Sequence, residues 1–82
     1  MKNTNITVNY FGSIAEITFC RQEVIVLKEN QSMDKLHDVL LKKYKPLKTA
    51  IYKFTHNQTI TENNPTLKDQ DEIALLPPFA GG

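Results

Sequence analysis

One segment of this 82-residue chain has the periodicity of a long amphipathic helix, and it lies between segments typical of strands. Its apolar residues recur at intervals of three and four along one stripe: Met33, Leu36, Val39, Leu40 and Tyr44. Ser32 is the expected N-cap, and Pro46 disfavours helical geometry at Lys45, where the helix is expected to end. Because a chain of this length has room for one small domain, this helix must cover one face of the sheet that the strands form.

The strands are predicted from alternation of polar and apolar residues. In residues 5–11, Ile6, Val8 and Tyr10 share one parity, which is typical of a half-buried strand with a polar outer face. Further strands are expected at residues 23–27, 50–54, 59–61 and 72–76. Residues 14–19 fit a strand and a helix equally well, so the pattern leaves that segment open.

The predicted order is therefore strand, strand, helix, strand, short strand, strand. A right-handed crossover through the helix returns the chain to the same sheet. This arrangement is a β-grasp, an α+β fold with a mixed sheet of four to five strands and one main helix on one face. We expect residues 1–76 to form this domain and residues 77–82 to form an extended tail, because Pro77 and Pro78 have no N–H to continue a ladder.

Charge and composition argue against several classes of function. Lys and Arg number 10 and Asp and Glu number 9, and this balance is unlike that of a nucleic-acid-binding protein that neutralises phosphates. Cys20 is the single cysteine, which excludes an internal disulfide and a site made of cysteines alone. No apolar run approaches the ~18 residues of a membrane span, and the first residues lack a signal-peptide stretch. We therefore expect a cytoplasmic protein with no membrane contact.

Conventional catalytic groups are scarce. His37 is expected on the solvated surface of the helix, and His56 follows the parity of Tyr52 and Phe54 as a partly buried structural histidine. Cys20 is interpreted as a packing or loop residue, because no base is identifiable near it. The glycines are Gly12, Gly81 and Gly82 and form no phosphate-binding loop, so no metal or cofactor site is expected in the chain.

The most informative feature is the segment Pro77-Pro78-Phe79-Ala80-Gly81-Gly82, which directly follows the last predicted strand. A frayed terminus is the simpler interpretation. However, about six extended residues reach ~20 Å, and two terminal glycines can pass through a narrow channel into another protein's active site. The prolines stiffen the exit and reduce the entropy that docking would cost.

The sequence resembles the small subunits of molybdopterin synthase, which are ubiquitin-like sulfur carriers, over nearly the whole chain. The internal segments that correspond to this family are residues 6–12, 14–17, 57–60 and 67–73. The family has a short helical turn at residues 14–17, so the resemblance favours a helix there. The ending Pro-Pro-x-x-Gly-Gly is the most specific motif, because thiamine-pathway carriers usually lack the proline pair. Gln70 and Cys20 stand where glycine is common, and His56 replaces an apolar residue. A left-handed turn at Gln70 would cost roughly 1 kcal/mol.

The resemblance implies a carrier mechanism. A ubiquitin-activating-like adenylyltransferase, using ATP and magnesium, would join Gly82 to AMP, and a persulfide donor would convert this adenylate into a thiocarboxylate. The large subunit, in a heterotetramer of two small and two large subunits, would take in the tail past Gly81 and supply the catalytic groups. Sulfur would pass to cyclic pyranopterin monophosphate in molybdenum cofactor biosynthesis. This chain would then be the sulfur-donating, non-catalytic subunit.

Parity and resemblance together predict a surface that binds the large subunit. Its expected members lie opposite the helix or in the tail: Phe11, Ile60, Leu76, Pro77, Pro78, Phe79 and Ala80. The alternatives are a carrier for thiamine or tRNA thiolation, a ubiquitin-like modifier joined to lysines through Gly82, and a plain interaction module whose Gly-Gly ending is accidental.

Overall fold

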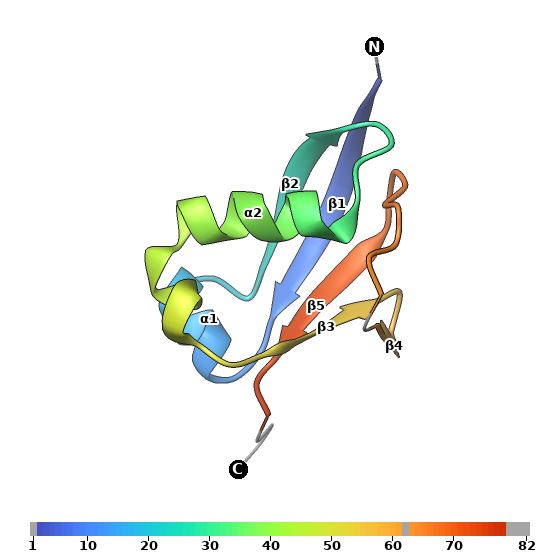
Figure 1. The fold of residues 1–82 in the computed structure, drawn as a ribbon. Helices are drawn as coiled ribbons and strands as arrows, with labels where there is room; N and C mark the ends of the chain where they lie inside the picture. The colour runs from blue at the N-terminus through green and yellow to red at the C-terminus, as the bar shows by residue number, and fades with distance from the viewer. Residues whose placement is uncertain (1, 62, 79–82) are drawn as a thin grey trace.

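A five-stranded mixed sheet forms one layer of the computed structural model, and the long helix lies across one face of it (Figure 1). The structure describes residues 2–61 and 63–78. In chain order the elements are β1 (Asn3–Tyr10), α1 (Ser13–Thr18), β2 (Gln22–Lys28), α2 (Met33–Lys43), the 3-10 helix η1 (Lys45–Thr49), β3 (Lys53–His56), β4 (Thr59–Ile60) and β5 (Glu72–Leu76).

The strand order is β2-β1-β5-β3-β4, so the first and last strands of the chain meet at the centre of the sheet. β1 and β5 are parallel, with Val8 beside Ile73, whereas the other neighbouring strands are antiparallel. The connection between β2 and β3 passes through α2, which covers the sheet. The β-grasp predicted from the order of the elements is therefore confirmed.

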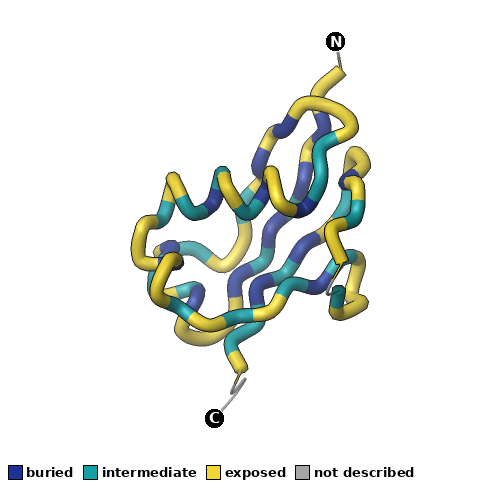
Figure 2. Tube along the Cα trace, viewed as in Figure 1, coloured by how far each residue is buried: buried dark blue, intermediate teal, exposed yellow. Residues whose placement is uncertain are grey.

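The core lies between the sheet and α2. Its buried apolar residues come from every layer: Ile6, Val8, Tyr10, Ile14, Ile25, Leu27, Met33, Leu36, Leu40, Leu47, Leu67, Ile73 and Leu75. Figure 2 shows how buried positions alternate with less buried ones along the central strands. The predicted inward parity of β1 and the predicted apolar stripe of α2 are confirmed, although Val39 and Tyr44 are only half-buried.

The segment after α2 differs from its prediction. Residues 50–52 belong to no strand, and β3 begins only at Lys53 and runs to His56. β3 pairs with β5, and Lys53 lies opposite Leu76, the last residue of β5. Pro77 follows and cannot donate to a ladder, so residues before Lys53 have no strand to pair with. Instead, residues 45–49 form η1, which buries Leu47.

Among the described residues, four turns adopt left-handed backbone at residues other than glycine, and two of them bear on predictions made from the sequence. Gln70 has a φ of +73°, so the turn before β5 keeps the left-handed geometry despite the side chain. Residues 14–19, which the pattern left open, form α1 followed by Phe19 at a φ of +60°. The left-handed position after α1 is therefore Phe19, one residue before Cys20.

Candidate docking face and tail exit

Phe11 and Leu76 lie side by side on the sheet face opposite α2. The register pairs Asn9 with Ala74 and Tyr10 with Leu75. The N–H of Phe11 donates to the carbonyl of Leu75 at 3.4 Å, which continues this ladder by one step. Because alternate residues of a strand face opposite sides, Phe11 and Leu76 share the face of Asn9 and Ala74. Phe11 is 49% exposed and Leu76 is half-buried, and neither belongs to the buried core.

Ile60 lies on the same face, farther along the sheet. It pairs with Thr55, and Thr55 pairs with Ala74, so all three residues point to one side. Ile60 is 58% exposed. The name docking face is used below for Phe11, Ile60 and Leu76. Their common face follows from the register, whereas their contact with a partner stays a prediction.

The tail leaves the sheet beside the turn between β1 and α1 (Figure 1). Gly12 in that turn has a φ of +54°, and a Cβ added to it would lie 3.1 Å from Cγ of Pro77. This contact is tighter than most real Cβ contacts, so a side chain here would require Pro77 to shift slightly, and the positive φ itself favours glycine. Pro77 is half-buried and Pro78 is exposed. Phe79, Ala80, Gly81 and Gly82 lie outside the described residues, so the roles expected of them stay predictions.

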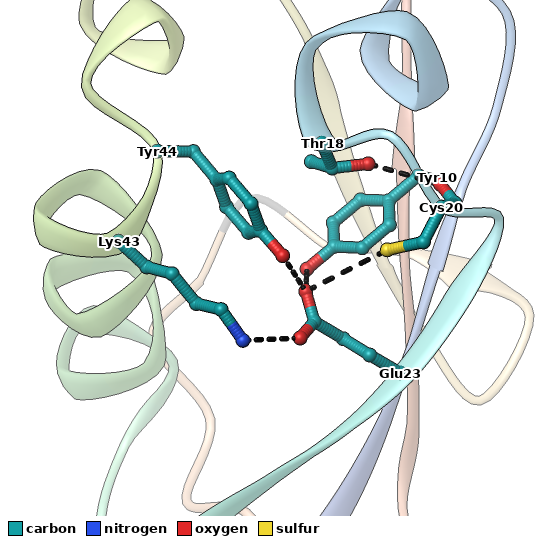
Figure 3. A network of polar contacts seen from close by, with 6 residues as sticks. All are labelled: Tyr10, Thr18, Cys20, Glu23, Lys43 and Tyr44. Carbon is teal, nitrogen blue, oxygen red and sulfur yellow. Dashed lines mark hydrogen bonds and ion pairs between the residues drawn. The ribbon is translucent and has the colours of Figure 1, made fainter.

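The half-buried carboxylate of Glu23 links β1, β2 and the end of α2 near this turn (Figure 3). The hydroxyls of Tyr10 and Tyr44 each donate to Oε2 of Glu23 at 2.5 Å. Nζ of Lys43 donates to Oε1 of the same carboxylate, also at 2.5 Å. Glu23 pairs with Val8 in the β1–β2 register and therefore shares the inward parity. A charged residue on the inward side of a strand indicates that other segments supply it with hydrogen-bond donors. This inference was not drawn for Glu23 in the sequence analysis.

The protonation states of Glu23 and its two tyrosine partners indicate a stabilising role in the fold rather than acid–base catalysis. Burial raises the pKa of Glu23, but hydrogen bonds from Lys43, Tyr10 and Tyr44 outweigh burial, and the net pKa lies below the ordinary 4.5. Burial, together with the Glu23 carboxylate, raises the pKa of both tyrosines, so they remain protonated donors. Sγ of Cys20 lies 4.0 Å from Oε2 of Glu23. A carboxylate with a lowered pKa is a poor base for that thiol.

The histidines occupy structural positions. Nε2 of His37 lies 2.7 Å from the hydroxyl of Tyr52, and its ring meets the rings of Tyr52 and Phe54 edge-on. His37 is half-buried, so the expectation of a solvated surface residue was wrong in this respect, and burial lowers its pKa despite nearby Asp34 and Asp38. His56 is half-buried as expected, with Nε2 2.7 Å from Oδ2 of Asp71.

Two further observations concern other classes of site. Within residues 2–61 and 63–78, no group of three or more His, Cys, Asp or Glu side chains is arranged to hold a metal ion. Over the same residues, no helix has the length and apolar character needed to cross a membrane.

Comparison with known proteins agrees with this architecture. The putative molybdopterin converting factor subunit 1 of Pyrococcus furiosus superposes with a TM-score of 0.86 at 20% identity, covering 92% of this chain and 98% of that chain. Small archaeal modifier protein 1 of Haloferax volcanii gives a TM-score of 0.81 at 18% identity, over 95% and 99% of the two chains. Its namesake from Methanosarcina acetivorans gives 0.81 at 20% identity over 100% of both. These likenesses show a shared fold.

The sequence comparison is more specific than the structural one. The sequence model of the ThiS family matches residues 8–82, which include the docking face, the proline pair and the two final glycines. The match thus covers nearly the whole chain, and the chain belongs to the ThiS family of ubiquitin-like sulfur carriers.

Proposed function

We propose that this chain carries sulfur as a thiocarboxylate on Gly82 and donates it to cyclic pyranopterin monophosphate within a molybdopterin synthase complex. The observation that carries the proposal is the ThiS-family match, which extends through Gly81 and Gly82. The Pro-Pro-x-x-Gly-Gly ending supports the molybdopterin pathway over the thiamine pathway. The fold shared with a putative molybdopterin converting factor is consistent with this choice.

The chemistry requires a partner for each step. A carboxylate is anionic and has no leaving group, so it is a poor electrophile until an adenylyltransferase joins it to AMP at the expense of ATP, with magnesium. Sulfur from a persulfide then displaces AMP, and a thiol cleaves the remaining S–S bond to leave the thiocarboxylate. Sulfur is more polarisable than oxygen and is therefore the better nucleophile toward the pterin precursor.

The residues of this chain position that group rather than catalyse the transfer. The docking face offers exposed apolar side chains to the large subunit, next to the point where Pro77 leads the chain away from β5. The two prolines limit the directions of the exit, which lowers the entropy lost when the tail is taken up. Gly81 and Gly82 carry no side chain and so present the narrowest possible cross-section to a channel in the partner.

A second candidate function is that of a ubiquitin-like modifier joined through Gly82 to lysine side chains. The shared fold with two small archaeal modifier proteins favours it, because activation of a C-terminal carboxylate is common to both functions. Carriers for thiamine or tRNA thiolation use the same activation and differ in the acceptor.

Intact mass spectrometry separates these functions. The chain is co-expressed with a ubiquitin-activating-like adenylyltransferase and a persulfide donor, with a variant lacking Gly82 as control. We expect a free chain in which one oxygen of the Gly82 carboxyl is replaced by sulfur, and no change in the control. Covalent adducts on many proteins would instead support the modifier, and an unchanged mass would contradict both.

A further assay tests the pathway. The thiocarboxylated chain is mixed with the large subunit and cyclic pyranopterin monophosphate, and the dithiolene product is measured. Thiocarboxylate that forms but does not transfer its sulfur here would overturn the molybdopterin assignment and leave the carrier function intact.

A further inference from the structure

Phe19 combines backbone strain with exposure. It is the C-cap of α1 with a φ of +60° and a ψ of +24°, a left-handed conformation that is unfavourable for a bulky residue. Its side chain is 93% exposed, so burial in the domain does not offset this cost. The residue lies in a short turn where glycine would be free of strain. An aromatic ring held in this way has no evident role in stabilising the fold.

The ring of Phe19 lines a surface groove together with Phe11. The groove has a volume of ≈ 870 Å³ and runs along α1, where Gly12, Ala15, Glu16 and Arg21 also line it. Its charged residues are one acid and one base, so it has no excess of either charge. Two aromatic walls without net charge suit an apolar side chain better than an anion or a cation.

The groove is continuous with the docking face and with the tail exit. Phe11 belongs to both surfaces, and Gly12 lines the groove while lying against Pro77. A protein that takes up the tail and covers Phe11 therefore meets the groove on the side of α1. A single partner that takes up the tail can therefore cover both surfaces.

We infer that the groove between Phe11 and Phe19 is a second part of the docking surface and receives an apolar side chain of the large subunit. The inference rests on the proposed function. According to this inference, Phe19 is an anchor residue. The contact of its ring with the large subunit offsets the cost of its left-handed backbone. The docking surface then extends from Ile60, across Leu76 and Phe11, to Phe19.

The test uses the purified full-length chain and the purified large subunit in a calorimetric titration, with thermal melts of the free chain. Phe19→Gly removes the ring and relieves the left-handed strain, so the melting temperature should rise or hold. The Kd for the large subunit should increase at least tenfold, as for an anchor residue. Ile51→Ala is the matched control, because Ile51 is 76% exposed and lies outside the groove, and its Kd should stay unchanged.

The possible results are distinguishable. If the wild-type chain binds and Phe11→Ala weakens binding while Phe19→Gly does not, the inference about the groove is wrong and the proposed function stands. If the wild-type chain does not bind the large subunit at all, both are overturned. If the free wild-type chain forms a dimer that Phe19→Gly abolishes, the groove belongs to a second copy, and the inference is again wrong.

Discussion

Glu23 is the residue that departs most from the pattern around it, since it shares the inward side of β2 with Ile25 and Leu27. Burying a carboxylate is costly unless hydrogen bonds replace the lost water. Here Tyr10, Tyr44 and Lys43 supply them from β1 and from the end of α2. The network therefore fixes how the end of the helix sits on the sheet, close to the groove and the tail exit.

Glu23→Gln should lower the free energy of unfolding at neutral pH by about 1–3 kcal/mol, because the charge-assisted bonds are lost. The folded pKa of Glu23 lies below 4.5, so the ionised group stabilises the fold above about that pH. This stability is lost as the pH falls through the folded pKa. Urea denaturation across a pH series should show the gap between variant and wild type closing in acid. Glu29→Gln, at an exposed position, is the control, and a gap that stays constant with pH would contradict the account.

Gln70→Gly should raise the free energy of unfolding by about 1 kcal/mol. Gln70 has a φ of +73°, where glycine has no steric cost from a Cβ. Gln70→Ala keeps the Cβ in the same turn and should give no such gain, so the pair isolates the backbone effect. Thermal and denaturant melts of both variants measure it, and equal stability of the two would rule out strain at this turn.

The sheet packs one face against the core, and we propose that its other face binds a partner. Phe11→Ala or Leu76→Ala should weaken binding to the large subunit by about 1–3 kcal/mol, as expected of apolar anchors. Each should destabilise the free domain less than Leu36→Ala, whose side chain is fully buried and whose loss should cost about 2–5 kcal/mol.

Calorimetric titration and thermal melts measure these two effects separately. Val24→Ala is the control, because Val24 is exposed on the same face but on the edge strand β2, away from the tail. Equal loss of affinity in Val24→Ala, or none in Phe11→Ala and Leu76→Ala, would contradict the proposed docking face.

The elements differ in how far the sequence determines them. Local periodicity was sufficient for β1 and α2, because one apolar stripe in each faces a single core. The start of β3 was not predictable from its own residues, since it depends on Pro77, which ends the pairing partner. The same holds for the site. Parity placed Phe11 and Leu76 on the outer face, whereas the partners of Glu23 and His37 come from distant segments that no local pattern brings together.

In the proposed function, the whole domain serves to present one reacting group, the thiocarboxylate on Gly82, to its partners. Deleting Gly82 should abolish thiocarboxylate formation while leaving the melting temperature unchanged, because Gly82 lies six residues beyond the end of β5. Gly81→Ala should slow activation, because the added Cβ would hinder passage of the tail through the partner channel that we propose. Intact mass and thermal melts check both, and a thiocarboxylate on the variant that lacks Gly82 would contradict the mechanism.

The free chain should neither hydrolyse ATP nor bind it tightly, since its three glycines form no phosphate-binding loop. AMP should become attached only when the adenylyltransferase is present. Phosphate release by the purified chain, compared with a sample that contains the adenylyltransferase, measures this. Robust turnover by the chain alone would argue against a carrier.

The parallel pairing of β1 with β5 at the centre of the sheet has a consequence for protein synthesis. Translation produces β1 before the other described elements and β5 after them, so β5 must leave the ribosome before the two central strands can pair. A chain cut short before β5 lacks the middle of its sheet and exposes apolar surface that the complete sheet buries. Only chains that include β5, and therefore reach the start of the tail, can complete the sheet.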